Sequence, residues 1–154
     1  MADRETVHRV AARVILVDER DRVLLIHGHD PGRPDLPSWW ITAGGGLDEG
    51  ESPEDGARRE VLEETGLQLG ELGPVVLTRA VAFEFEGIWI EQAESFFIAR
   101  VEAPSGGLDT SGWNEIERRS LHELRWWTLA DLATTNAVVY PEGLLEVLRD
   151  NLIG

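Results

Sequence analysis

The stretch GGGLDEGESPEDGARREVLEETGL, residues 44–67, decides how this chain folds. After its opening glycines, Ser52 and Pro53 make a good helix start, because serine can cap a helix and proline suits the first helical position. Gly66 is a typical helix stop. The pattern therefore predicts a helix over residues 53–65.

The predicted helix gathers glutamates on one side. Residues three and four apart share a helix face, so Glu60, Glu63 and Glu64 are expected to point one way, while Val61 and Leu62 face the core. Like charges at this spacing cost about 0.2–0.5 kcal/mol per pair. A hard divalent cation such as Mg²⁺ or Mn²⁺ would relieve the repulsion, since it prefers oxygen ligands. From charge alone, however, a solvated helix face is the commoner explanation.

The spacing of the whole stretch separates these two interpretations. Gly45 lies six residues before Glu51, Glu51 lies eight before Arg59, and EVLEETGL follows over residues 60–67. This pattern resembles the Nudix hydrolase box, G-x5-E-x7-R-E-U-x-E-E-x-G-U, where U is a bulky aliphatic residue. Residues 45–67 match every specified position. Such a match is far more specific than a short glycine motif.

The resemblance implies an enzyme and its metal. Nudix hydrolases use Mg²⁺ or Mn²⁺ to cleave a pyrophosphate bond in a nucleoside diphosphate linked to another moiety, of nucleotide, ADP-ribose or dinucleotide type. Carried over by position, Glu60 and Glu64 become the first metal ligands. Glu63 would share the metal or act through a bound water, and it is the favoured general base.

Other positions of the box take supporting roles in the resemblance. Arg59 and Glu51 resemble the pair that braces the box without binding the metal. Gly45 would let the backbone turn tightly, and its carbonyl could reach a metal. Because a further acidic ligand usually comes from outside the box, Glu117 and Glu123 rank first as candidates.

Aromatic side chains and subfamily markers say less about the substrate. Trp89 and Phe83 are candidates for stacking on a nucleobase. The proline that ADP-ribose-preferring members share is replaced by Ala82. The resemblance therefore leaves the substrate class open. It also implies a possible homodimer, because dimers are common in the family.

Outside the box the chain alternates strand and helix patterns. A hairpin is expected from residues 7–17 and 23–26, and a second from residues 75–81 and 88–101 with its turn at residues 83–87. The remaining expected elements are short strands at residues 38–42 and 124–127 and helices near residues 129–134 and 144–152. We expect a single α+β domain over residues 1–154, with the Nudix fold, an α/β/α sandwich around a mixed sheet.

Composition excludes several classes of function. The net charge is −15, so binding of nucleic-acid polymers or anionic membranes is not expected. There is no cysteine and no lysine, which removes thiolate and Schiff-base chemistry. Met1–Glu5 lacks the features of a secretory signal, and a cytoplasmic location is expected.

Three functions remain open at this point. The first is a pyrophosphohydrolase acting on a small nucleotide-type molecule. The second is a Nudix-like domain that binds a nucleotide or metabolite as a sensor without cleaving it, although such domains usually lose a glutamate of the box. The third is an acidic surface helix on an unrelated scaffold.

Overall fold

The computed structural model describes residues 6–152, so Met1–Glu5, on which the signal-peptide expectation rests, lies outside the described residues. The strands are β1 (Thr6–Val17), β2 (Val23–Gly28), β3 (Trp39–Ile41), β4 (Ala43–Gly46), β5 (Val75–Phe85), β6 (Ile88–Arg100), β7 (Leu121–Trp127) and β8 (Val138–Tyr140). The helices are α1 (Pro53–Thr65), α2 (Glu115–Ser120), α3 (Leu129–Thr134) and α4 (Leu144–Leu152).

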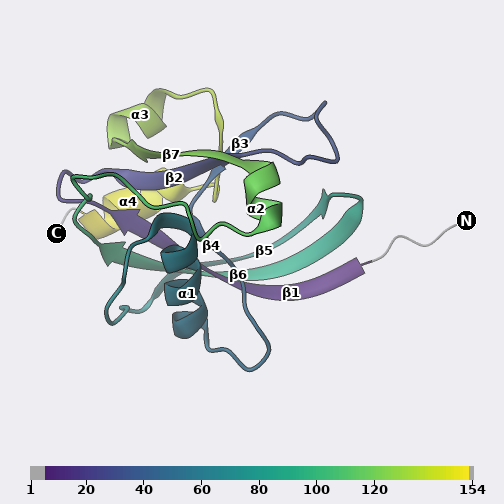
Figure 1. The fold of residues 1–154 in the computed structure, drawn as a ribbon. Coiled ribbons are helices and arrows are strands. Elements are labelled where there is room, and N and C mark those ends of the chain that lie inside the picture. The colour runs from purple at the N-terminus through teal and green to yellow at the C-terminus, as the bar shows by residue number, and fades with distance from the viewer. Residues whose placement is uncertain (1–5, 153–154) are drawn as a thin grey trace, which may run out of the picture.

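Strand β1 lies at the centre of the fold because both of its faces are covered. Val14 and Leu16 pack with α1, whereas Ile15 and Val17 pack with Leu148 of α4. A strand covered on both faces needs an almost continuous apolar run, and the second half of β1 has one. The sheet therefore separates two apolar cores, and the predicted α/β/α arrangement is confirmed (Figure 1).

The sheet is mixed and its strand order is β5-β6-β1-β2-β3-β8, with β4 against β1 and β7 against β2. Strand β1 runs parallel to β6 and antiparallel to β4. It pairs with β2 at Val17 and Val23, so the first predicted hairpin separates almost at once. The space between the diverging strands lets β4 lie beside β1.

The turn between β1 and β2 is fixed by a buried carboxylate. Asp18 accepts hydrogen bonds from the backbone N–H groups of Arg20 and Arg22, at 3.0 and 2.9 Å, and from the Arg22 guanidinium. A short side chain that bonds to its own turn in this way replaces ladder hydrogen bonds. The turn is thus well ordered although the strands on either side of it diverge.

The second predicted hairpin is confirmed, but its turn was placed too early. Strand β5 continues to Phe85, and only Glu86 and Gly87 form the turn, with φ of 49° and 81°. Positive φ at both central residues is the geometry of a two-residue hairpin turn that matches the strand twist. Phe83 consequently lies in the strand, opposite Ile90.

Helix α1 has the predicted bounds and caps. The Ser52 side chain accepts from the backbone of Asp55, and Gly66 adopts a left-handed φ of 78°. Val61 is fully buried, but Leu62 is 46% exposed, so the prediction that Leu62 faces the core was wrong. Val61 lies on the same stripe as Ala57 and Thr65, which are also buried, whereas Leu62 lies about 100° further around the helix.

The sequence patterns did not predict three elements, strands β4 and β8 and helix α2. Helix α2 follows a capping box in which Asn114 and Glu117 bond each other's backbone. That Asn-x-x-Glu spacing was the available signal.

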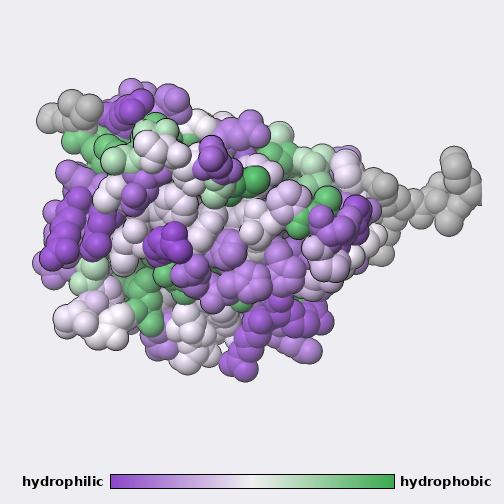
Figure 2. Space-filling model, turned by 90° about the horizontal axis from the view of Figure 1, so that it is seen from above, coloured by the Kyte–Doolittle hydropathy of each residue, from purple (hydrophilic) through white to green (hydrophobic). Residues whose placement is uncertain are grey.

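No helix among residues 6–152 is both long and apolar enough to cross a bilayer. The face seen from above is largely hydrophilic, with small apolar patches (Figure 2).

The core beneath α4 provides a stability test. Leu148→Ala should lower the free energy of unfolding by about 2–5 kcal/mol, because the side chain is fully buried and its loss leaves a cavity. Leu62→Ala makes the same change at an exposed helix position and should stay within about 0.5 kcal/mol of wild type. Urea unfolding measures both, and equal losses would contradict this placement of the core.

Candidate metal centre

Helix α1 lies against the glycines of β4, and this contact positions two glutamates. A Cβ atom at Gly45 would lie 2.8 Å from Cδ of Glu60, so only glycine leaves room for that carboxylate. The backbone N–H of Gly44 donates to Oε1 of Glu64 at 2.7 Å. Glu64 is 3% exposed, whereas the side chain of Glu60 is 13% exposed. The glycine strand thus holds one carboxylate by its shape and the other by its backbone.

The role expected for Gly45 needs correction. It lies within β4, opposite Ala12 of β1, rather than in a tight turn. On the edge of β4 that faces β1, the N–H of Leu47 donates to the carbonyl oxygen of Val10. On the opposite edge, the carbonyl oxygen of Gly46 accepts a hydrogen bond from Arg59. Alternation along an antiparallel ladder therefore directs the Gly45 carbonyl toward β1, away from the glutamates. Gly45 contributes to the site because it has no side chain, which leaves room for the carboxylate of Glu60.

A third carboxylate reaches Glu60 and Glu64 from a distant part of the chain. One oxygen from each of Glu60, Glu64 and Glu117 lies within 4.8 Å of the others. Glu117 is carried by α2, whose start is fixed by its capping box. The indole N–H of Trp113 also donates to the backbone oxygen of Glu64, at 2.9 Å, and so joins this segment to α1. The Trp113 and Gly44 contacts were not anticipated from the sequence.

The structure does not bring every predicted acid to this cluster. Glu63 stands at its margin, with its side chain 39% exposed and Oε2 3.4 Å from Nη1 of Arg59. Glu123 lies on β7 opposite His27 and forms an exposed ion pair with Arg125. The structure thus separates Glu123, the other candidate from outside the box, from the cluster.

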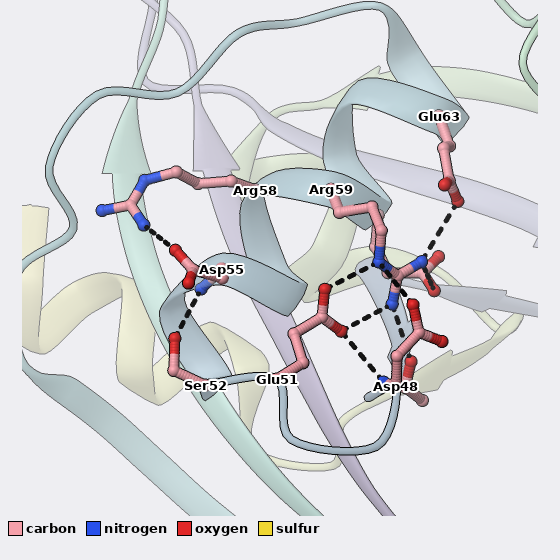
Figure 3. Close-up of polar contacts among 9 residues, drawn as sticks. Asp48, Glu51, Ser52, Asp55, Arg58, Arg59 and Glu63 are labelled. Atoms are coloured by element: carbon pink, nitrogen blue, oxygen red, sulfur yellow. Dashed lines mark hydrogen bonds and ion pairs between the residues drawn. The ribbon is translucent and has the colours of Figure 1, made fainter.

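Arg59 connects the helix to the loop before it. Its Nε and Nη2 donate to the two carboxylate oxygens of Glu51, each at 2.9 Å (Figure 3). The third nitrogen, Nη1, donates to Glu60 at 3.0 Å. A two-point contact of this kind fixes both groups in direction. The Arg59 guanidinium, aided by the backbone of Asp48, lowers the pKa of Glu51 to about 2.

Burial makes the three clustered carboxyl groups hard to ionise. It is the main cause of the raised pKa values of Glu60 and Glu117, and it raises the pKa of Glu64 well above its usual range. The charges of Glu60 and Glu117 raise the pKa of Glu64 further, while the Gly44 N–H opposes them. Three such groups so close together call for a positive charge.

The donor set fits a hard divalent cation. All three converging groups are carboxylates, the ligands that Mg²⁺ and Mn²⁺ prefer. Few protein ligands suffice for Mg²⁺, which normally keeps waters or substrate phosphates in its other positions.

The two candidate stacking residues lie elsewhere on the sheet. Trp89 and Phe83 are both half-buried on the β5–β6 hairpin, close to its turn. Trp89 pairs across the sheet with Glu84. A stacking role for either remains a prediction.

A match over almost the whole chain agrees with the family that residues 45–67 indicate. The profile of the NUDIX domain matches residues 7–147. The chain belongs to the Nudix family. Among its relatives is the "Nudix hydrolase 26, chloroplastic" of Arabidopsis thaliana, 28% identical over 120 residues that cover 70% of this chain and 54% of the relative.

This chain is also similar to a second relative and to a solved structure. The "Oxidized purine nucleoside triphosphate hydrolase" of Mus musculus is 42% identical over 77 residues, 48% of this chain and 44% of the relative. The chain thus spans about half the length of these curated relatives or less. The Nudix domain of Shewanella oneidensis NrtR complexed with ADP ribose superposes with a TM-score of 0.67 at 20% identity, covering 95% of this chain and 89% of that one. This likeness confirms the predicted fold.

The space left by Gly45 can be tested directly. Gly45→Ala should weaken Mg²⁺ binding about 10-fold or more, because the new methyl group displaces Glu60. The Mg²⁺-induced rise in Tm measures this, since a ligand of the folded state stabilises by mass action. Gly46→Ala is the matched control, because its Cβ would make only an ordinary 3.6 Å contact with Arg9. Equal shifts in both variants would rule out this role for Gly45.

The raised pKa values predict a pH dependence. A carboxyl group whose pKa is higher in the folded than in the unfolded state stabilises the fold at low pH, and that contribution disappears as pH rises through the folded pKa. In EDTA, Glu64→Gln should therefore gain Tm relative to wild type over the pH interval that begins at the ordinary pKa of a glutamate and extends upward.

With Mg²⁺ present the effect should reverse. Binding requires the carboxylates to lose their protons, so the Mg²⁺-induced rise in Tm of wild type should grow over the same pH interval. A shift in Tm that is independent of pH would contradict the raised pKa values at this cluster.

Proposed function

We propose that this Nudix chain is a Mg²⁺- or Mn²⁺-dependent pyrophosphohydrolase that cleaves a nucleoside diphosphate linked to another moiety. The observation that carries the proposal is the approach of Glu60, Glu64 and Glu117 to within 4.8 Å of one another. A solvated acidic face would keep its charges apart, whereas here Glu64 is almost fully buried. Family membership, together with relatives named as hydrolases, supports the same function.

In this proposal, Glu60, Glu64 and Glu117 hold the cation. When bound there, a divalent cation would neutralise the pyrophosphate and lower the pKa of a water. A protein of net charge −15 needs such a cation before it can accept a polyanion. Arg59 keeps Glu60 in place through a hydrogen bond of 3.0 Å from Nη1.

We assign the general base to Glu63. It stands at the margin of the cluster and is 39% exposed, so it can reach a water molecule that the buried glutamates leave accessible. Glu63 takes a proton from this water molecule while the oxygen of the water forms a bond to phosphorus. The bond from that phosphorus to the bridging oxygen breaks, and the bridging oxygen leaves on the other phosphate. Water is consumed and two phosphate products form.

The substrate is proposed as a small nucleotide-type molecule, with neither a nucleic-acid polymer nor a membrane as partner. Relatives suggest two compounds to try first. One relative is named for oxidised purine nucleoside triphosphates, and one solved Nudix domain holds ADP ribose.

Two glutamine variants separate metal binding from catalysis. Glu64→Gln should abolish turnover and most of the Mg²⁺-induced rise in Tm, because it removes a buried ligand. Glu63→Gln should keep the Tm shift yet lower kcat about 100-fold or more, as expected for loss of a general base. The assay is hydrolysis of nucleoside triphosphates, oxidised purine nucleoside triphosphates, ADP-ribose, NADH and dinucleoside polyphosphates with Mg²⁺ or Mn²⁺.

The controls decide among the remaining functions. Glu123→Gln should leave both readouts unchanged, because Glu123 lies outside the cluster. Metal binding without turnover of any compound would favour a sensor. If no metal binds at all, the result would favour the third function, in which α1 is only an acidic surface helix.

A further inference from the structure

Three of the chain's four histidines lie together where β2 ends and β7 begins. His27 is in β2, His29 comes directly after this strand, and His122 is the second residue of β7. The two strands run side by side and antiparallel (Figure 1). The ring centroid of His122 lies 4.6 Å from that of His29 and 5.2 Å from that of His27. We call these three residues the histidine cluster.

A β-bulge brings His122 to the other two histidines. In the ladder between β2 and β7, His27 pairs with Glu123 and Gly28 pairs with Leu121, so His122 is an extra residue between two ladder pairs. Successive residues of a regular strand face opposite sides, and without the bulge His122 would point away from the face of His27. Bulges commonly re-aim one side chain in this way. The strand pairing itself therefore assembles the histidine cluster.

Contacts with neighbouring segments hold His27 and His29 in place. The backbone N–H of His29 donates to the carbonyl oxygen of Ser120, the last residue of α2, at 2.9 Å. The ring of His27 stacks on Trp40 with 4.5 Å between the centroids, and its Nε2 lies 2.8 Å from Oγ of Ser38. Two of the three histidines are thus positioned before any ligand binds.

The charges around the histidine cluster are compatible with a bound cation. Burial, followed by the neighbouring His122, lowers the pKa of His27, so this ring is neutral near pH 7 and does not repel a metal ion. Glu123, opposite His27 in the ladder, forms an exposed ion pair of 3.4 Å with Arg125. The charges of these two residues therefore largely cancel.

Two imidazole nitrogens face each other within the cluster. Nδ1 of His29 lies 2.6 Å from Nε2 of His122, and the ring planes differ by 15°. One of the two nitrogens carries a proton when they form a hydrogen bond, and a neutral imidazole can instead carry its proton on the outer nitrogen. With both protons on the outer nitrogens, the two inner lone pairs converge on one point. Converging neutral imidazoles are the commonest protein ligands of transition metals.

We propose that His29 and His122 bind a divalent transition-metal ion such as Zn²⁺, Ni²⁺ or Cu²⁺, with water in its remaining positions. Imidazole suits these ions, whereas the carboxylates of Glu60, Glu64 and Glu117 suit Mg²⁺ and Mn²⁺. Two nitrogens that bind one Zn²⁺, each at about 2.0–2.1 Å, lie about 3 Å apart. The exposed imidazole of His122 can rotate from its present position to reach that spacing. This second site is independent of the proposed function, because neither histidine belongs to the carboxylate cluster.

The test is calorimetric titration of Ni²⁺ into the untagged protein, with Mg²⁺ in excess to occupy the carboxylate cluster. Wild type should bind one Ni²⁺. His122→Gln should bind it about 10-fold more weakly or worse, because even the loss of a residue that only supports a metal ligand commonly costs that much. Because His122 is exposed, this variant is expected to fold as wild type does.

His8→Gln is the matched control. It removes the fourth histidine, which lies on β1 and contacts Glu91 at 3.2 Å with its side chain 74% exposed. Its affinity for Ni²⁺ should equal that of wild type. Equal affinities in wild type and His122→Gln, or an equal loss in His8→Gln, would overturn the inference.

Electron paramagnetic resonance of bound Cu²⁺ distinguishes this site from the carboxylate cluster. With Mg²⁺ in excess, wild type should show coupling to two imidazole nitrogens, and His122→Gln to one at most. Glu64→Gln should keep the nitrogen coupling and the Ni²⁺ affinity even though it loses the Mg²⁺-induced rise in Tm, so the two proposals can fail separately. Nitrogen coupling that is absent from wild type, or unchanged in His122→Gln, would overturn the histidine site.

Discussion

Burial of Glu60, Glu64 and Glu117 close together is the constraint on which the arrangement of this protein depends. The three carboxyl groups lie within 4.8 Å of one another, and burial is the main cause of their raised pKa values, so they weaken the fold when they ionise with no cation near. The apolar side of α1 must offset that cost. Val61 does so by packing against the sheet, together with the two apolar cores that β1 separates.

The glycine strand β4 allows this packing. A Cβ at Gly45 would displace Glu60 of α1, and Gly44, whose N–H donates to Glu64, has a φ of 137° and no room for a Cβ against β1. The strand itself exists because β1 and β2 separate just after their turn. A bifurcation in the sheet is therefore what brings a glycine backbone to the glutamate helix.

Arginines around the centre form ion pairs with carboxylates of the protein. Arg59 is bonded at two points to Glu51 and also reaches Glu60, so its charge is used within the protein. Arg13 and Arg79 are likewise used by Glu94. In a chain of net charge −15, these guanidinium groups balance carboxylates of the protein itself.

The sequence by itself determined what depends on near neighbours. Helix periodicity placed Glu60 and Glu64 on one face, Ser52 and Gly66 set the helix ends, and the box identified the family. Tertiary structure decided which distant groups meet them. It brought Glu117 in on α2, left Glu63 at the margin and Glu123 outside, and paired β1 with β4 instead of extending the first hairpin. The physical reason is that periodicity fixes only the direction of a side chain along its own element, whereas contacts between elements depend on how both faces of the sheet are buried at once.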